Sequence, residues 1–290
     1  MTRRGFTLAE MIMSLTLTSA VLALATHAIV AQMRFLGGVS SVAGVRSELG
    51  QVTGVVQSLL WAVSPSDISM AQDSALELRV PIGSAAVCEG APGTLTIPAA
   101  SSTTDNALSA FTQAPDVGDR VVVLLDDSLG GSWASFDLLA PPVSAGRCDR
   151  FALDESLRFS APTAVDLSAA RAVHVLRPFR LSIYHASDGR WYLGGRDWNG
   201  IQGRFNSIQP IAGPLRPYDR DSTITGLRFS YGDSAGLTLA APVDPSRIAT
   251  IAMMTRVETG EPVRGTGIKT TPAGTVRDSV SFVVLLRNRM

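Results

Sequence analysis

Glu10 poses the clearest chemical question in this 290-residue sequence, because it is a carboxylate inside an apolar stretch. From Phe6 to Val30 the only other ionisable side chain is that of His27. About 25 residues, at a helical rise of about 1.5 Å each, could cross a hydrocarbon core of about 30 Å. Since a charged side chain at the bilayer centre costs about 2.5 to 3.5 kcal/mol on insertion scales, this carboxylate predicts a function and a partner.

The peptide bond between Gly5 and Phe6 offers one such partner. Glu10 follows Phe6 by about one helical turn. If the chain were cut at this bond, the new α-amino group of Phe6 would lie near the helix end. There it could neutralise a carboxylate in its own or a neighbouring subunit. Cleavage would create the cation that the apolar stretch lacks.

The charges that flank the apolar stretch predict its orientation. Arg3 and Arg4 come directly before it, and the next charged residue is Arg34. A basic flank on the N-terminal side favours a cytoplasmic N-terminus. The sequence therefore predicts a single membrane-spanning helix, with the residues that follow it outside the cytoplasm.

The segment Arg3-Arg4-Gly5-Phe6-Thr7-Leu8-Ala9-Glu10 and its apolar continuation resemble the start of the type IV prepilin family, which includes the pseudopilins of type II secretion. The resemblance implies that a membrane prepilin peptidase cuts after Gly5 and N-methylates Phe6. It also implies that Glu10, the fifth residue of the mature chain, guides subunits into a helical filament. The implied partners are other pilins or pseudopilins and an inner-membrane assembly platform. The implied location is the inner membrane, crossed once, with a periplasmic or other extracytoplasmic head that becomes part of a filament after assembly.

Three other interpretations compete for the same segment. An ordinary secretory signal would place a cut near Ala23-Leu24-Ala25. A twin-arginine signal could include Thr2-Arg3-Arg4-Gly5-Phe6. A plain membrane anchor needs only the apolar length. None of the three explains the carboxylate of Glu10.

The helix is expected to continue beyond the membrane and to pack on the rest of the chain. The pattern predicts a helix over residues 6–64, transmembrane over 6–30 and amphipathic over 31–64, after a leader of residues 1–5. Apolar residues recur there at intervals of three and four, and Arg46, Glu48, Gln51 and Gln57 fall off their stripe. The members of the stripe are Leu36, Val39, Val42, Val45, Leu49, Val52, Val56, Leu59 and Val63. Because several glycines weaken this helix, packing against a sheet must hold it.

Residues 65–290 are predicted to form a β-rich extracytoplasmic head. Alternation of apolar and polar residues from Leu76 to Ile82 is typical of a half-buried strand. Ser187-Asp188-Gly189 lies between two strand-like segments and predicts a hairpin. Further predicted strands are Thr94–Ile97, Arg120–Leu125, Ser132–Leu139, Leu157–Ser160, Arg180–His185, Arg190–Leu193, Ile224–Tyr231, Leu237–Ala240, Arg247–Val257 and Ser279–Arg287. The expected fold class is α+β, a long N-terminal helix on a mostly antiparallel, pilin-like head.

The C-terminal segments narrow the resemblance. Thr223–Tyr231, Pro245–Ile248 and Phe282–Asn288 are similar to the closing strands of large minor subunits, the J class of type II secretion and the W class of type IV pili. The length of the chain agrees with such minor subunits, and a place in a tip or initiation complex stays open. The presence of Glu10 argues against the K-class pseudopilin, which lacks this acid.

Cys88 and Cys148 are the only cysteines. Outside the cytoplasm an even pair favours a disulfide, and both residues lie in loop-like, Gly-, Pro- and Ser-rich surroundings. The alternative is two free thiols, because sequence separation alone does not bring two Cα atoms within about 7 Å. Two cysteines by themselves also cannot build a zinc cluster.

No catalytic motif is found, so we expect no active site and no enzyme. The sequence has no P-loop, no His-Glu-x-x-His, no Cys-x-x-Cys and no nucleophile elbow. His174 and His185 are expected to be ordinary strand residues. The aromatic residues Trp191, Tyr192 and Trp198 are expected to pack within a hairpin, with a contact surface as the alternative.

No cofactor or metal is expected, and calcium is the one alternative. It rests on Asp219, Asp221 and Asp233, or on Asp126 and Asp127, and neither set has the spacing of an EF-hand loop. Solvated turns are the plainer interpretation of these acids.

Two classes of function follow. A formal net charge of +0 indicates no surface for nucleic acid, unless the filament is a competence pilus. The first class is a structural subunit, a minor pilin or pseudopilin of a type II secretion or type IV pilus filament. The second is a recognition module, a pilus-borne adhesin or DNA-uptake factor. The same leader serves both.

Overall fold

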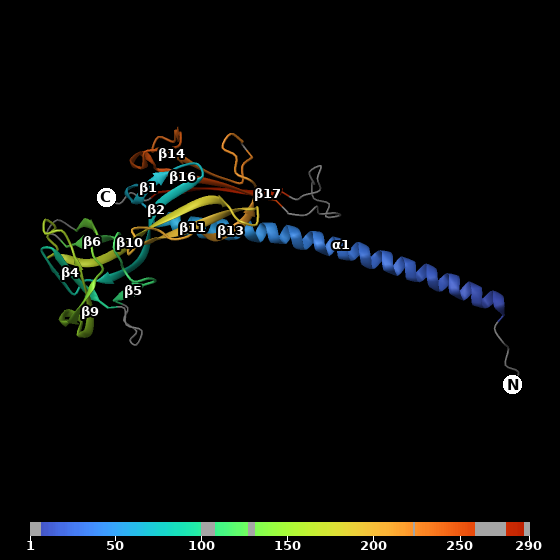
Figure 1. Cartoon of the computed structure of the whole chain (residues 1–290), viewed down its shortest axis with the longest axis horizontal. Helices are drawn as coiled ribbons and strands as arrows, with labels where there is room; N and C mark the ends of the chain where they lie inside the picture. Colours follow the sequence, from blue (N-terminus) through green and yellow to red (C-terminus); the bar gives the residue numbers. More distant parts are fainter. Residues whose placement is uncertain (1–6, 100–107, 127–130, 223, 259–276, 287–290) are drawn as a thin grey trace.

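A long, gently curved helix projects from a head built of β-strands (Figure 1). The computed structural model describes residues 7–99, 108–126, 131–222, 224–258 and 277–286. The helix, α1, spans Leu8–Trp61 and is 54 residues long. It ends three residues before the predicted end at Ser64, because the chain turns into the short 3-10 helix η1 (Pro65–Asp67). A residue that precedes proline is disfavoured in the helical conformation, which accounts for this earlier end.

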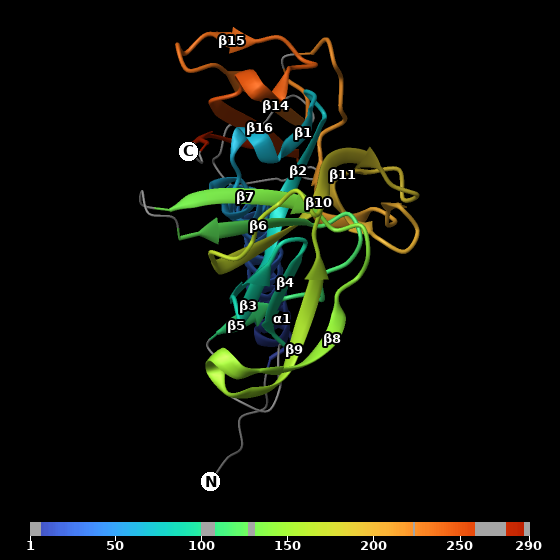
Figure 2. The same ribbon diagram turned by 90° about the vertical axis from the view of Figure 1, so that its left-hand side faces the viewer.

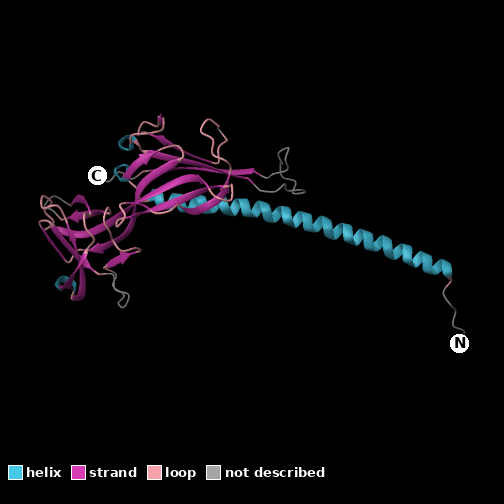
Figure 3. Ribbon diagram, in the orientation of Figure 1, coloured by secondary structure: helices cyan, strands magenta, loops and turns pink. Residues whose placement is uncertain are grey.

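Antiparallel strands form the head, with two further 3-10 turns, η2 (Asp149–Phe151) and η3 (Pro245–Arg247) (Figure 3). The strands are β1 Ile68–Ala71, β2 Ala75–Ala86, β3 Glu89–Ala91, β4 Thr94–Pro98, β5 Ser109–Phe111, β6 Arg120–Leu125, β7 Ser132–Asp137, β8 Val143–Cys148, β9 Leu153–Ser160, β10 Ala170–His185, β11 Trp191–Asn199, β12 Arg204–Phe205, β13 Gln209–Leu215, β14 Leu227–Gly232, β15 Thr238–Leu239, β16 Thr250–Glu258 and β17 Arg277–Leu285.

The described strands belong to two sheets. The larger follows the order β1-β2-β10-β11-β13-β16-β14-β15, with β17 on β16 and the β6–β7 pair on β10. The smaller has the order β3-β4-β9-β8. This arrangement, one long apolar helix with a large antiparallel β head, is the α+β class expected from the sequence.

The C-terminal part of α1 forms one wall of the first hydrophobic core. Its buried side chains point at β13, β16 and β17, and they are Val45, Leu49, Val52, Val56 and Leu60, followed by Val63. Among the apolar side chains of the stripe, burial begins at Val42, which is 9% exposed, whereas Val39 is 45% exposed. The amphipathic segment predicted from residue 31 is therefore packed only from Val42 onward. Leu36 and Val39 continue the apolar stripe but lie before the sheet.

A second hydrophobic core lies in the other lobe of the head, built from the segment inserted between β2 and β10 (Figure 1). Its buried side chains come from the two sheets and include no residue of α1; they are Ile82, Ala85, Val87, Leu95, Ile97, Val121, Val123, Phe136, Leu138, Phe159, Leu167, Ala170, Val173 and Val175. Only β2 and β10 are long enough to enter both cores. Each contributes leucine or isoleucine side chains to the first core at one end and apolar side chains to the second at the other.

The two cores meet at an irregularity and a buried ion pair on β10. The β10–β2 register shifts between Val175 and Leu176, the point at which β10 passes from one core to the other. Next to it, Arg177 donates from Nε to Asp119 Oδ1 at 2.9 Å and from Nη2 to Asp119 Oδ2 at 2.7 Å. Arg177 also donates to the carbonyl oxygen of Ala114 at 2.7 Å. The hydrogen bond with Asp119 raises the pKa of the Arg177 guanidinium. This bidentate pair fixes the loop before β6 to β10.

All of the predicted strands are found, with changed bounds, and several further strands were not predicted. The predicted hairpin is β10–β11, in which His185 pairs with Trp191. Strand β10 begins at Ala170, ten residues before its predicted start at Arg180, because Pro178 and the register shift interrupt its alternation. The strands that the sequence did not predict are β1, β3, β5, β8, β12 and β13.

Candidate functional site on the N-terminal helix

The described chain begins with a capping box that uses Glu10. The amide and the hydroxyl of Thr7 donate to Glu10 Oε2 at 2.9 Å and 3.0 Å, and the Glu10 amide donates back to Thr7 Oγ1 at 3.3 Å. These contacts satisfy backbone N–H groups that have no partner at a helix start. Glu10 is thus part of the structure of its own helix as well as an exposed carboxylate.

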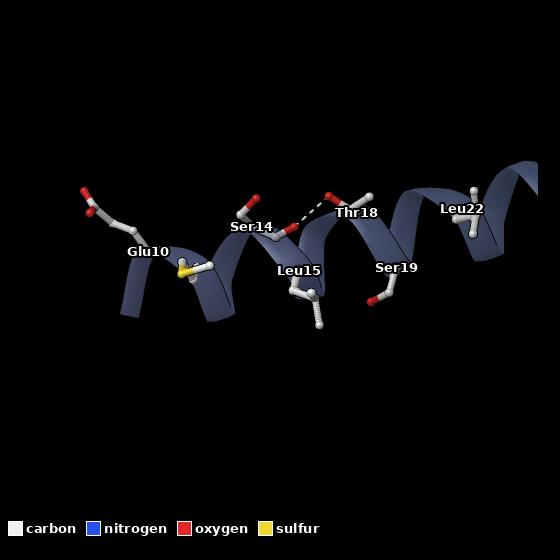
Figure 4. Close-up of a pocket in the computed structure, with 7 residues that line it drawn as sticks. Glu10, Ser14, Leu15, Thr18, Ser19 and Leu22 are labelled. Atoms are coloured by element: carbon white, nitrogen blue, oxygen red, sulfur yellow. Dashed lines mark hydrogen bonds between the residues drawn. The ribbon is translucent and has the colours of Figure 1, made fainter. Parts of the chain in front are cut away.

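On one face of the first turns of α1, two polar groups have no hydrogen-bond partner among the described residues. The second oxygen of Glu10, Oε1, has no hydrogen bond among the described residues, and neither has the hydroxyl of Ser14. Figure 4 shows both side chains on the same side of the helix, one turn apart. A carboxylate oxygen accepts hydrogen bonds, and a hydroxyl both donates and accepts. This face can therefore receive a cation together with a neutral polar group.

The other hydroxyl groups of the apolar segment are satisfied within the helix. Thr16 donates to the carbonyl oxygen of Met13, Thr18 to that of Ser14, Ser19 to that of Thr16 and Thr26 to that of Leu22. Such bonds let a hydroxyl enter hydrocarbon without an unsatisfied donor. They leave Glu10 as the acid that needs a partner from outside this helix.

The N-terminal part of α1 is long and apolar enough to span a membrane. Its most apolar 18-residue window has a mean hydropathy of 1.8 and none of it is buried. Exposed apolar side chains continue past residue 30 with Met33, Phe35, Leu36 and Val39. From Leu8 to Val39 the exposed apolar segment is about 48 Å long at about 1.5 Å per residue, which exceeds a hydrocarbon core of about 30 Å. We call residues 31–41 the neck, the part of α1 between the predicted span and the head.

Polar contacts join the last part of α1 to the head. Arg46 Nε lies 3.7 Å from Asp278 Oδ2 on β17. The amide of Gly213 on β13 donates to Glu48 Oε2 at 3.4 Å. The two acids of α1 therefore differ: Glu48 has a partner on the head, whereas the hydrogen bonds of Glu10 among the described residues all lie in its own cap.

The predicted cleavage and methylation site, Gly5 and Phe6, lies outside the described residues. Thr7, the helix-capping residue next to this site, is described, and its hydrogen bonds indicate what cleavage would leave in place. Cleavage after Gly5 would leave the Phe6–Thr7 peptide bond intact. The Thr7 amide would therefore still donate its hydrogen bond to Glu10. A new α-amino group would then stand one residue before the cap.

The two cysteines are joined in the structure. Cys88, between β2 and β3, and Cys148, at the end of β8, have Cα atoms 5.5 Å apart and form a disulfide. Arg150 Nη1 donates to the carbonyl oxygen of Val87 at 3.0 Å and holds the same two segments together. The disulfide therefore links the segment after β2 to the end of β8, beside the second core.

The other residues singled out from the sequence lie in ordinary structural settings. His174 and His185 are on β10, and Trp191 packs against the first core. Trp198 Nε1 donates to the carbonyl oxygen of Val117 at 3.0 Å. The Tyr192 hydroxyl donates to Asp188 Oδ2 at 2.7 Å; this bond, with one from the Arg190 amide, holds the pKa of Asp188 below its usual range.

The acids considered for calcium do not come together. Asp219 accepts from the amide of Asp221, Asp233 accepts from the amides of Ala235 and Leu237, and Asp126 pairs with Arg171. Asp127 lies outside the described residues. Within the described ranges, no group of three or more His, Cys, Asp or Glu side chains could hold a metal ion.

Thr7 and Ser14 are the site residues that the sequence reasoning missed. The spacing Thr7-x-x-Glu10 is the signature of a capping box, and this signal was available. Ser14 is one helical turn after Glu10, so only its position on the same face marks it. No family model, curated protein or solved structure matches this chain.

Proposed function

We propose that this chain is a minor pilin or pseudopilin subunit of a type II secretion or type IV pilus filament. In this proposal a prepilin peptidase cuts after Gly5 and methylates Phe6. The mature subunit is held in the inner membrane by α1, with the head outside the cytoplasm. The observation that carries the proposal is α1 itself: it has an exposed apolar segment, it begins with an acid whose hydrogen bonds among the described residues lie in its own cap, and its other end packs into the head.

The capping box gives Glu10 two separate roles. Oε2 holds the helix start through Thr7, and Oε1 stays available to the α-amino group of a Phe6 in a neighbouring subunit. An ion pair in hydrocarbon is worth forming because each charge alone is costly there. The neck supports the same proposal, since its exposed apolar side chains extend beyond the membrane core and would be covered by neighbouring helices in a filament.

The experiment compares three variants in the native host. Glu10→Gln removes the charge but keeps an oxygen that can accept from Thr7, Glu10→Ala removes both, and Thr7→Ala removes the hydroxyl and keeps the charge. We expect both Glu10 variants to be inserted and cut but to lose co-purification with neighbouring pilins by at least about tenfold, which corresponds to about 1.4 kcal/mol. Thr7→Ala should stay close to wild type.

The Gln variant separates the charge from the cap. If Glu10→Gln and Glu10→Ala both assemble like wild type, this acid is not an assembly determinant and the proposed role is wrong. If Glu10→Gln assembles normally and only Glu10→Ala and Thr7→Ala fail, the cap, and not the charge, matters.

A further inference from the structure

A small cleft lies between the two lobes of the head, away from α1's exposed segment. One wall is η1, with Ser66 and Asp67, and the other is the outer face of β6 and β7. Figure 2 shows the ribbons of β6 and β7 between those of β14 and β16 and those of β4 and β9. The cleft is partly open to solvent and has a volume of about 260 Å³, which suits one ring-sized group and not a helix.

Trp133 supplies the apolar surface of the cleft. Its side chain on β7 is 49% exposed, although its neighbours on the opposite face of β6 and β7 are buried in the second core. Its ring centroid lies 6.1 Å from that of His174 on β10, which the strand register places beside Val122 on the same face of the sheet. Val122 and Ala134 complete the apolar part of the lining. A half-exposed indole on a rigid sheet offers a flat apolar face at low cost in conformational entropy.

The polar groups of the cleft balance in charge. Arg120 donates to Asp137 through Nε at 2.9 Å and through Nη2 at 3.3 Å, so its charge is already paired. Asp67 is buried and accepts from the Ser64 amide at 3.0 Å. The hydroxyls of Ser66 and Ser135 complete the polar lining. Two arginines, Arg79 and Arg120, interact with the two acids Asp67 and Asp137 at this place, so the cleft does not favour a charged ligand of either sign.

We propose that this interlobe cleft binds a neutral saccharide, with a sugar ring stacked on Trp133 and its hydroxyls bonded to the polar wall. A pyranose has an apolar C–H face and a rim of hydroxyl groups, which matches a lining that is apolar at Trp133 and polar at Ser66, Arg120 and Ser135. A proline or aromatic side chain of a peptide could also cover the indole but would make no hydrogen bonds to the hydroxyls of Ser66 and Ser135, so such peptides are the competing ligands in the test.

The proposal goes beyond the filament function and does not depend on it. The residues that line the cleft all belong to the head, and none is on the exposed segment of α1. It gives a specific chemical form to the recognition role that the sequence left as an alternative. A filament subunit and a subunit of another membrane assembly could both carry such a site.

The test uses the full-length chain in detergent. Binding is measured on an array of neutral and acidic oligosaccharides, together with proline-rich and aromatic peptides, and the best neutral sugar is then titrated by calorimetry. We expect binding to neutral sugars, and a loss of affinity of about tenfold or more in Trp133→Ala. Trp61→Ala is the matched control, because Trp61 is 59% exposed and does not line the cleft.

Each outcome has a defined meaning. Unchanged thermal unfolding of Trp133→Ala shows that its loss is local, and Trp133→Phe, which keeps an aromatic face, should retain part of the affinity. The proposal is overturned if no neutral sugar binds, if Trp133→Ala binds as well as wild type, or if only the peptides bind. Equal losses in Trp133→Ala and Trp61→Ala would also overturn it.

Discussion

The two hydrophobic cores of the head are built in different ways. The first has α1 as one wall, and this helix packs against β13, β16 and β17. The second has no residue of α1; two sheets face each other, and the disulfide Cys88–Cys148 links the segment after β2 to the end of β8. Strands β2 and β10 run through both lobes, and the contacts around Arg177 and the bond from Trp198 to Val117 join them further.

This difference separates two tasks within one chain. The first core joins the head to the helix, so a force or a binding partner that acts on α1 acts directly on the side chains that pack against the sheet. The second core is held by its own sheets and covalent bond, and it carries Trp133 and one wall of the cleft. We therefore expect the helix to govern the stability of the first lobe, and the disulfide that of the second.

The largest expected effect is the loss of a helix side chain from the first core. Leu60 is 0% exposed and Leu17 is 66% exposed, on the same helix. Leu60→Ala should lower the free energy of unfolding by about 2 to 5 kcal/mol, because it leaves a cavity. Leu17→Ala should change it by less than about 0.5 kcal/mol. Denaturant unfolding of the detergent-solubilised chain measures both, and equal effects would contradict the division of α1 into a free and a packed part.

The next effect is that of the disulfide on the second core. The two cysteines are 60 residues apart, and closing a loop of that length contributes at most about 4 kcal/mol in the chain-entropy treatment. The double variant Cys88→Ala, Cys148→Ala should lose amide-exchange protection first in β4, β6 and β9. Protection in β14 and β16 should change less. Uniform loss across both lobes would show that the two cores unfold as one unit.

The smallest effect tests a hairpin end that belongs to neither core. The Tyr192 hydroxyl and the Arg190 amide lower the pKa of Asp188 in the folded state. Its contribution to stability is therefore present above the ordinary carboxyl pKa of about 3.9 and is lost as the pH falls through the lowered pKa. Tyr192→Phe should move the Asp188 pKa back toward its usual value, as followed by carboxyl NMR during a pH titration. Protection of both cores should stay unchanged; an unmoved pKa would contradict the assigned cause.

Periodicity predicted α1 and much of the head, because a helix or strand that is buried on one face has apolar residues at regular intervals in the sequence. The stripe from Val42 to Val56 is buried as expected. Leu36 and Val39 follow the same period yet remain exposed, because only the position of the sheet decides where packing begins. The stripe also predicted Leu59 where the fully buried residue is Leu60.

Two cores and a cleft could not be predicted from local patterns. The alternation of β10 is interrupted near Leu176 and Pro178, but a local interruption does not reveal that a second core begins there. The cleft joins Ser66 to Trp133, which are far apart in sequence, and its formation depends on tertiary contacts. In contrast, the capping box of Thr7 and Glu10 is a local signal that a reading of the sequence could have included.

The most direct test of the central claim is the intact mass and N-terminal peptide of the chain extracted from its host membrane. A filament subunit assembled through α1 is predicted to begin at N-methylated Phe6. The same sample should show an intact Cys88–Cys148 pair, which verifies that the head reached an oxidising compartment. A mature start at Thr26, or an uncut chain that begins at Met1, would contradict the prepilin account.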